Sequence, residues 1–429
     1  MKKYYPIIGL EVHIELNTIS KMFCQCKSDY FNKKPNSEVC PVCLGLPGAL
    51  PVPNKKAIEY TQMLAKALGC KLNTKAHFDR KHYFYPDLPK GYQISQYEEP
   101  FGIGGKFELK NKTIHIRRVH LEEDTGKLIH ESNASYVDFN RSGVPLVEIV
   151  TEPDFDNSDD VKEYLEYLHL LVKQYLKISN ANMEEGSMRL EPNISLTTSL
   201  KNFPNYKIEV KNINSFKYVQ KAIDYEIKRQ EEMLNSNKII KNETRGFNEK
   251  KNITFSQRSK EEAKDYRYFP EPDIPPFSFT EKEFTLINLP ELSYEKYNRY
   301  LKIDKLTEYQ SNILIKNTVK ANLYEKLSTK FKSKELNSKI ANFVINKVLT
   351  FNSKLEDNLK AYLNLDKNIP EDIALQINKV FEENQKAVND FKTGKENAIF
   401  FLIGQVIQKI GNKIDIEKLK TIIIEELKK

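Results

Sequence analysis

Two carboxylates and an imidazole recur at every second position near the start of the chain. Glu11, His13 and Glu15 alternate with apolar residues between Ile8 and Leu16. Because side chains on a β-strand point to opposite faces in turn, the apolar set can be buried while the polar set faces whatever lies above the sheet. Such a polar face suits a metal ion or proton transfer, but an antiparallel strand with one solvated face shows the same alternation. This segment alone leaves both interpretations open.

Two further acidic segments favour the chemical interpretation. One is the run 120–124, His-Leu-Glu-Glu-Asp, and the other is Glu148 inside the apolar run 144–150. A carboxylate in an apolar strand is costly to bury unless it binds a cation or a partner charge. An ion pair with Arg117 or Arg141 is one explanation for Glu148. The alternative is a hard cation bound by carboxylate oxygens and the first strand's histidine, retaining waters for phosphate ligands as magnesium prefers.

A third group with chemical potential is a cysteine quartet in the loop 24–43. Cys24 and Cys26 form one close pair, and Cys40 and Cys43 form another. Two pairs of thiolates at this separation can form a tetrahedral zinc site with little backbone strain. Four thiolates leave no coordination position for a substrate, so we expect the zinc to be structural.

The elements that must position these groups divide the chain into two parts. The first part mixes strands with helices, among them a helix over 158–176 capped by Ser158 and a second helix after Ser215. Beyond about residue 292 the sequence turns to lysine-rich amphipathic helices with little glycine. We therefore predict an α+β protein, with a mixed α/β domain followed by an all-α region.

Composition narrows the partners and the compartment. The 429 residues include 67 Lys+Arg and 59 Asp+Glu, a net charge of +8 that permits a nucleic-acid partner without requiring one. No apolar run approaches the roughly 20 residues needed to span a bilayer, and the start does not resemble a signal peptide. We expect a cytoplasmic protein without a membrane partner.

Long, ordered motifs then suggest a family. The chain resembles the B subunit of the aspartyl/glutamyl-tRNA(Asn/Gln) amidotransferase from its first strand to its last helices. The motifs that carry the resemblance are 8–13 (IGLEVH), 78–87 (FDRKHYFYPD), 92–96 (YQISQ), 138–148 (DFNRSGVPLVE), 184–189 (EEGSMR), 211–216 (KNINSF) and 265–270 (DYRYFP).

The resemblance implies a domain plan and a reaction. It implies a cradle-shaped catalytic domain over 1–292, a shortened helical linker over 293–364 and a helical tail over 365–429 that contacts tRNA. In a heterotrimer with the amidase (A) and the small C subunit, this ligase component would use ATP and Mg²⁺ to phosphorylate the side-chain carboxyl of Glu-tRNA(Gln) or Asp-tRNA(Asn). Ammonia that the amidase releases from glutamine would then displace the phosphate.

The resemblance also implies roles for individual residues. The expected magnesium ligands are His13, Glu123 and Glu148, and Glu11 supports them as a fourth catalytic residue. Expected contacts to ATP or substrate come from Asn140, Arg141, Ser187 and Arg189. Lys81, Tyr85 and Lys90 are expected along the route of ammonia or at the mouth of the site.

Two features of the sequence depart from the family pattern. Glu191-Pro192 stands where the family usually has Asp-Ala, and the helical half is shorter than usual. The related archaeal-type protein usually carries a large inserted domain, which does not fit here. An alternative of another class is a zinc-containing tRNA-binding module that positions tRNA without catalysing phosphorylation. The acidic residues argue against that alternative.

Overall fold

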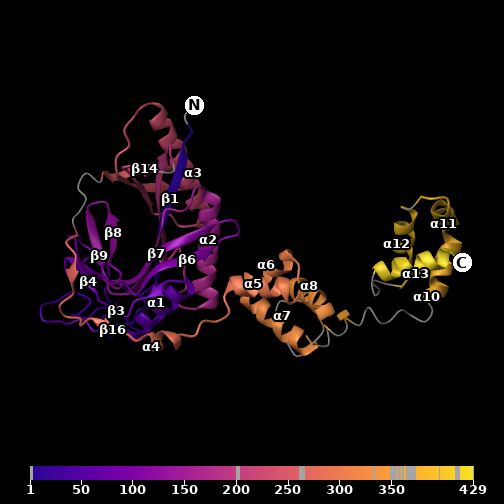
Figure 1. Cartoon of the computed structure of the whole chain (residues 1–429), viewed down its shortest axis with the longest axis horizontal. Coiled ribbons are helices and arrows are strands. Elements are labelled where there is room, and N and C mark those ends of the chain that lie inside the picture. The colour runs from indigo at the N-terminus through magenta and orange to yellow at the C-terminus, as the bar shows by residue number, and fades with distance from the viewer. Residues whose placement is uncertain are drawn as a thin grey trace. The chain divides into compact units, whose positions relative to one another are not determined.

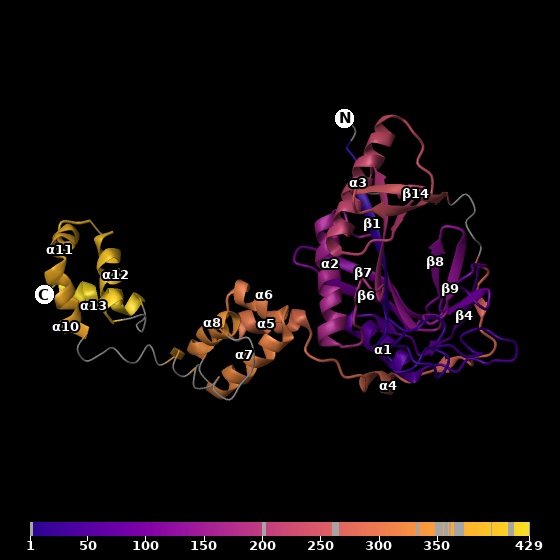
Figure 2. The same cartoon turned by 180° about the vertical axis from the view of Figure 1, so that it is seen from behind.

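The chain divides into two compact units, residues 1–293 and residues 294–429 (Figures 1 and 2). The computed structural model describes residues 3–199, 203–259, 266–331, 334–347, 355, 359, 362–363, 373–395, 397–410 and 416–428. The predicted boundary between linker and tail, at 364/365, lies outside the described residues.

The first unit is built on a nine-stranded sheet in the order β14-β13-β12-β11-β1-β10-β7-β6-β2. Every neighbouring pair in it is antiparallel except β12 and β13, which are parallel. The strands are β1 (Tyr5–Glu15), β2 (Lys71–Leu72), β6 (Gly102–Glu108), β7 (Thr113–Glu123), β10 (Pro145–Thr151), β11 (Met188–Thr197), β12 (Ile208–Lys211), β13 (Glu243–Asn248) and β14 (Ile253–Ser259). With the helices of the second unit, this sheet confirms the predicted α+β class.

Three small sheets complete the strands of this unit. They are β15-β4-β5, β16-β3 and the hairpin β8-β9. Their strands are β3 (Lys75–Ala76), β4 (Asp79–His82), β5 (Tyr92–Ser95), β8 (Lys127–Glu131), β9 (Ala134–Asp138), β15 (Phe269–Pro270) and β16 (Phe277–Ser278). Both views show the hairpin on one side of the large sheet and helices α2 (Ser158–Leu170) and α3 (Phe216–Asn235) on the other (Figures 1 and 2).

The alternation in the first strand separates core from site. Ile8, Leu10 and Val12 are almost completely buried, in one core with residues of α1 (Lys55–Ala67), α2 and α3. The intervening polar side chains therefore project from the opposite face of the sheet. Since β1 pairs with β10 on one side and β11 on the other, it holds the middle of that polar face.

The two predicted helices are present, with one change at a cap. Helix α2 continues as a single π-helical stretch, Leu171–Tyr175, so the helical path covers most of the predicted 158–176. Its N-cap is Asn157, whose side chain accepts from the amide of Asp160, and the prediction of Ser158 as the cap was wrong by one residue. The second helix follows Ser215 as predicted, and Ser215 is its N-cap, whose side chain accepts from the amide of Tyr218.

The regular elements among the described residues beyond β16 are all helices. The bounds are α4 (Glu281–Thr285), α5 (Ser293–Lys302), α6 (Glu308–Ile315), α7 (Thr318–Phe331), α8 (Asn337–Lys347), α10 (Ile373–Glu383), α11 (Gln385–Lys392), α12 (Ala398–Ile410) and α13 (Ile416–Lys428), with a short 3₁₀ turn at Lys334–Leu336. Buried residues of α10, α12 and α13 share one core, which includes Ile377, Leu402 and Ile423. Within the described residues, no helix has the length and apolar character needed to cross a membrane.

Replacing Gly105 by alanine is expected to destabilise the first unit. A Cβ at this position in β6 would lie 2.5 Å from the carbonyl oxygen of Leu68 and 2.6 Å from Cys70 Sγ, so backbone must shift. We expect a loss of about 1–3 kcal/mol in unfolding free energy, measured by chemical denaturation. Gly9→Ala is the control, since its Cβ would meet only Pro153, at 3.6 Å. Equal stability of the two variants would contradict this description of the packing.

Candidate active site

The polar face of the large sheet forms the floor of a cleft of about 680 Å³. Strands β1, β7, β10, β11 and β12 supply most of the lining residues of the cleft. Lys81 and the tyrosines at 83, 97, 266 and 268 are among the other lining residues. Its charged lining residues are Glu11, His13, Lys81, Arg117, Arg118, His120, Glu122, Asp124, Glu148, Arg189, Glu191, Lys207, Glu209 and Lys211. Acidic and basic side chains thus share one open space.

The first acidic cluster forms because three neighbouring strands are in register. His13 on β1 lies opposite Glu148 on β10, and Glu148 lies opposite His120 on β7. Glu148 Oε2 is 3.3 Å from His13 Nε2 and 3.1 Å from His120 Nε2, and His13 Nε2 is 3.8 Å from Glu122 Oε1. His13, Glu122 and Glu148 each offer a ligand atom within 4.8 Å of the others, so the three could hold one metal ion.

The imidazoles supply the counter-charge for Glu148. Burial alone would raise the pKa of this carboxyl group, but His120 and His13 hold it well below its usual range. Burial disfavours the charged form of His13, yet Glu148 raises its pKa to about 9. Arg117 pairs with Glu152 instead, and Arg141 with Asp124, so neither arginine is the ion-pair partner considered for Glu148. A cation could take the place that protons hold between these groups.

Glu123 does not belong to this cluster, and Glu122 occupies the expected place. Strand alternation turns Glu123 to the opposite face of β7, where Glu123 Oε1 is 2.8 Å from Lys90 Nζ and accepts from the amide of Ile94 at 3.0 Å. The sequence held the signal that separates the two residues. Glu122 is two positions from His120 and therefore shares its face, whereas Glu123 shares the face of the buried Leu121.

A second acidic cluster lies beside the first. Glu11, Glu191 and Glu209 come from β1, β11 and β12 and offer oxygens within 4.8 Å of one another. Lys211 Nζ is 2.7 Å from Glu191 Oε2 and 3.4 Å from Glu209 Oε1. Burial raises the pKa of Glu11, and the nearby Glu148 and Glu191 raise it further. This crowding of carboxylates favours a bound cation.

Glu209 lies in no motif of the family resemblance, and Glu191 stands out in the sequence only as a departure from the family pattern. A polar residue between Ile208 and Val210 in a short strand was the available signal for Glu209. Pro192 is accommodated because the β11–β12 pairing covers only Asn193 and Ile194, so the missing amide hydrogen falls where that pairing has ended.

Lys81 lines the cleft and keeps its positive charge there. Burial disfavours its charge, but the carboxylate of Glu122 contributes to a pKa above the usual lysine value. Its ammonium lies 5.1 Å from the ring centroid of Tyr266 and 6.0 Å from that of Tyr83. It therefore faces the cleft from an aromatic wall rather than from an ion pair.

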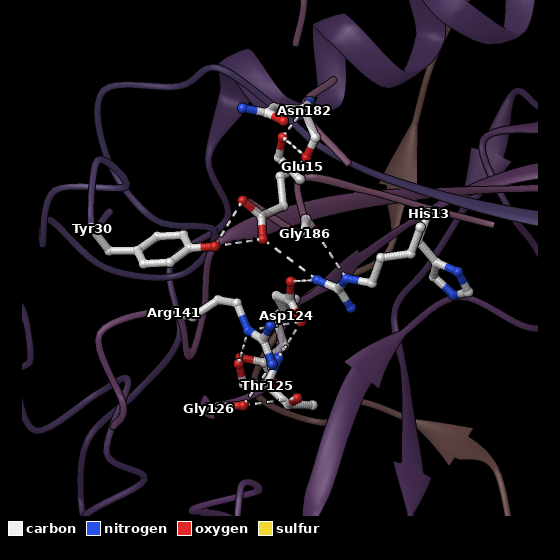
Figure 3. A network of polar contacts seen from close by, with 12 residues as sticks. His13, Glu15, Tyr30, Asp124, Thr125, Gly126, Arg141, Asn182 and Gly186 are labelled. Carbon is white, nitrogen blue, oxygen red and sulfur yellow. Dashed lines mark hydrogen bonds and ion pairs between the residues drawn. The ribbon is translucent and has the colours of Figure 1, made fainter. Parts of the chain in front are cut away.

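The other expected contact residues fall in different places. Arg189 and Lys81 line the cleft. Arg141 is turned away, with its guanidinium donating to the carbonyls of Thr125 at 2.9 Å and Gly126 at 2.8 Å (Figure 3). Tyr85 is half exposed and outside the cleft lining.

Asn140 and Ser187 also lie outside the cleft lining. Asn140 is buried and ties the cysteine loop to the segment before β10, since it accepts from the amide of Glu38 at 2.8 Å and donates to the carbonyl of Lys34 at 2.8 Å. The Ser187 hydroxyl accepts from the amide of Asn182. Both side chains shape loops instead of facing the acidic clusters.

A smaller hollow of about 210 Å³ adjoins the cleft. The two share Glu11, Arg117, Val150 and Lys207 in their linings. One wall of the hollow is Phe203, whose side chain is 67% exposed, with Pro153 and Tyr206 among the other lining residues. Asn193 Oδ1 is buried there without a hydrogen-bond partner among the described residues. An exposed aromatic ring and an unused acceptor suit a flat, polar-edged group.

The four predicted zinc ligands come together. Sγ atoms of Cys24, Cys26, Cys40 and Cys43 lie within 4.8 Å of one another. A hydrogen bond from the Cys24 thiol, together with the Lys21 ammonium, lowers the pKa of Cys43 to about 5. Lys21 is completely buried, with Nζ 3.7 Å from Cys43 Sγ and 2.7 Å from the carbonyl of Glu38. A buried ammonium beside the quartet fits a cluster of negatively charged thiolates.

Comparison with known proteins places the chain in a family. The GatB/GatE catalytic domain matches residues 6–285, and the GatB domain matches residues 299–427. The B subunit of the aspartyl/glutamyl-tRNA(Asn/Gln) amidotransferase of Thermosipho melanesiensis is 40% identical, over 98% of each chain. The B subunit of Persephonella marina is 48% identical over 81% of this chain and 74% of its own length.

The B subunit of Caldanaerobacter subterraneus is 41% identical over the whole of both chains, in an alignment of 480 positions that is longer than this chain of 429 residues. A family domain thus covers the unit that carries the cleft, and relatives match the chain from end to end. The chain belongs to the family of aspartyl/glutamyl-tRNA(Asn/Gln) amidotransferase B subunits.

Proposed function

We propose that this chain is the kinase component of a glutamine-dependent tRNA amidotransferase. It would transfer the terminal phosphoryl group of ATP to the side-chain carboxyl of Glu-tRNA(Gln), Asp-tRNA(Asn) or both. The observation that carries the proposal is the pair of carboxylate clusters on the floor of a cleft otherwise rich in lysine and arginine. That combination suits a nucleotide whose phosphates need cations on every side.

Magnesium would be held by the chain's own carboxylates. His13, Glu122 and Glu148 are the proposed ligands of one ion, and Glu11, Glu191 and Glu209 could hold a second. An ion held by these residues would supply positive charge to offset the negative charge that develops on the phosphate oxygens. The low pKa of Glu148 keeps that carboxyl group ionised and ready to bind a cation.

The remaining cleft residues would bind and orient the reactants. Lys81, Arg118 and Arg189 line the cleft and can meet phosphoryl or carboxylate oxygens. Their task is positional, because phosphoryl transfer depends mostly on alignment and on stabilising charge. Phosphorylation turns a carboxylate oxygen into a leaving group, which ammonia can then displace.

The hollow beside the cleft would take the base of ATP. The base would stack on Phe203, and its amino group could donate to Asn193 Oδ1, the acceptor that lacks a partner among the described residues. The phosphates would then run past Arg117 and Lys207, which both spaces share, toward the acidic clusters.

The proposed partner proteins, tRNA and zinc ion are those that the family resemblance implies. We propose a heterotrimer with the amidase (A) and the small C subunit, in which the helical tail contacts the misacylated tRNA. Lys90 and Glu123 line a separate hollow of about 160 Å³ next to Cys24 and Cys43, a candidate passage for ammonia. Zinc on the four cysteines would hold the loop that forms this hollow.

Glu148→Gln is expected to abolish tRNA-dependent ATP turnover in the assembled complex. Removing the charge deprives both histidines of their nearest counter-ion and the cation of a ligand. We therefore expect a loss of at least about 100-fold in kcat. The matched control is Glu59→Gln, which breaks an exposed pair with Lys56 outside the cleft lining. Undiminished turnover by Glu148→Gln would favour a tRNA-positioning module without chemistry of its own.

Phe203→Ala is expected to weaken ATP binding with little effect on kcat. Loss of the stacking surface should raise the KM for ATP by about tenfold, since base–aromatic stacking contributes roughly 1–3 kcal/mol. Phe255→Ala on β14 serves as the control, because that ring is 43% exposed and lines neither space. An unchanged KM for ATP in Phe203→Ala would contradict the proposed position of the base in this hollow.

Cys43→Ser is expected to lose the bound zinc. The purified chain should contain about one zinc per molecule, measured by elemental analysis, and the variant much less, because a hydroxyl is a poor zinc ligand. Cys70→Ala should keep its zinc, as Cys70 lies outside the quartet. Wild-type protein purified without zinc from zinc-replete cells would contradict this assignment.

A further inference from the structure

We propose that Asp124 is a positioning residue that fixes the guanidinium of Arg189 for the phosphoryl transfer. This inference rests on the proposed function. Asp124 directly follows β7, and its side chain is only 1% exposed. Its backbone is held on both sides, because its amide donates to the carbonyl of Val144 at 2.8 Å and its carbonyl accepts from the amide of Gly143 at 2.9 Å. The carboxylate therefore has little freedom to move.

Two arginines approach this one buried carboxylate from different directions. Arg189 Nη2 donates to Asp124 Oδ2, and Arg141 Nε lies 3.6 Å from Asp124 Oδ1. Figure 3 shows Asp124 beside Arg141, with Thr125 and Gly126 below. Arg141 is anchored on those two carbonyls and faces away from the cleft. It thus braces Asp124 from behind, while Arg189 alone of the two reaches the cleft.

Arg189 is held at one edge and open at the other. It lies opposite His13 in the β1–β11 register, so both side chains project from the same face. Its Nε donates to the carbonyl of Gly186 at 3.0 Å, and Nη2 also lies 3.4 Å from Glu15 Oε1. Nη1 has no hydrogen-bond partner among the residues the structure describes. That remaining nitrogen can meet an anion next to the first acidic cluster.

Glu15 forms the second support of the same guanidinium. Its Oε1 accepts from the hydroxyl of Tyr30 at 3.0 Å, which orients the carboxylate toward Arg189 (Figure 3). A guanidinium fixed at Nε and Nη2 presents its planar fork in one orientation, the arrangement that suits bidentate contact with phosphate or carboxylate. Without Asp124 the arginine could turn toward other carboxylates of the cleft. The guanidinium of Arg189 would keep its positive charge, but the charge would no longer have a fixed position beside the first acidic cluster.

The test is a double-mutant cycle in the complete complex with its partner proteins and tRNA. Asp124→Asn should lower kcat for ATP-dependent phosphorylation by about 10–100-fold, with KM values for ATP and tRNA changed less than about threefold. Arg189→Gln should lower kcat at least as much. If Asp124 acts through Arg189, the double variant should be no slower than Arg189→Gln alone.

A matched control separates positioning from stability. Glu226 is completely buried and contacts Arg229 at 2.8 Å and Arg245 at 3.0 Å, outside the cleft. Glu226→Gln should lower the melting temperature as Asp124→Asn does and yet retain its kcat. If Asp124→Asn does not fold, Arg141→Gln removes the rear brace and should show a smaller loss that likewise disappears in the Arg189→Gln background.

Three results would overturn the inference. Independent, multiplicative losses in the double variant would overturn the role of Asp124, as would an equal loss of kcat in Glu226→Gln. A wild-type complex that transfers no phosphate would instead overturn the proposed function together with this inference. Normal wild-type transfer with non-additive losses supports both.

Discussion

The register of β1, β10 and β7 is the constraint on which the rest of the site depends. It sets His13, Glu148 and His120 side by side across three strands, so one buried carboxylate faces two imidazoles. A shift of one residue in either pairing would turn Glu148 into the apolar core and an isoleucine or valine into the cleft. The apolar residues beneath β1 and β10 therefore fix the chemistry above them, because burying them enforces the register.

Charge balance is the second theme of the cleft. Burial and neighbouring carboxylates raise the pKa of Glu11, whereas His120 and His13 lower the pKa of Glu148 despite its burial. Lysines such as Lys211 offset further negative charge in the second cluster. Buried charge of this density weakens a fold unless each group has a partner. Concentrating it on one sheet face, over an uninterrupted core, confines that cost to the place where cations and phosphates are to bind. The Asp124–Arg141–Arg189 group extends the same principle to an arginine at the cleft's edge.

Sequence patterns predicted those parts of the fold that follow from local rules. The alternation around Glu11 and His13 located the central strand, and the cysteine spacing located the quartet that the structure brings together. Family resemblance supplied the expected role of His13 as a magnesium ligand. Strand alternation turns Glu122, rather than Glu123, to the face that carries His13 and Glu148. The place of Glu209 beside Glu11 and the role of Asn140 depend on long-range pairing and loop contacts, which no local pattern in the sequence records.

The central claim is that this cleft activates a carboxyl group by phosphorylation. The most direct measurement is transfer of labelled terminal phosphate from ATP to misacylated glutamyl-tRNA or aspartyl-tRNA, with the complete complex and with every nitrogen donor withheld. The account predicts that labelled phosphoryl-aminoacyl-tRNA accumulates, because the activated intermediate forms but ammonia is absent. Firm tRNA binding with no labelled tRNA and no tRNA-stimulated ATP turnover would contradict it, and would leave the chain as a tRNA-positioning module.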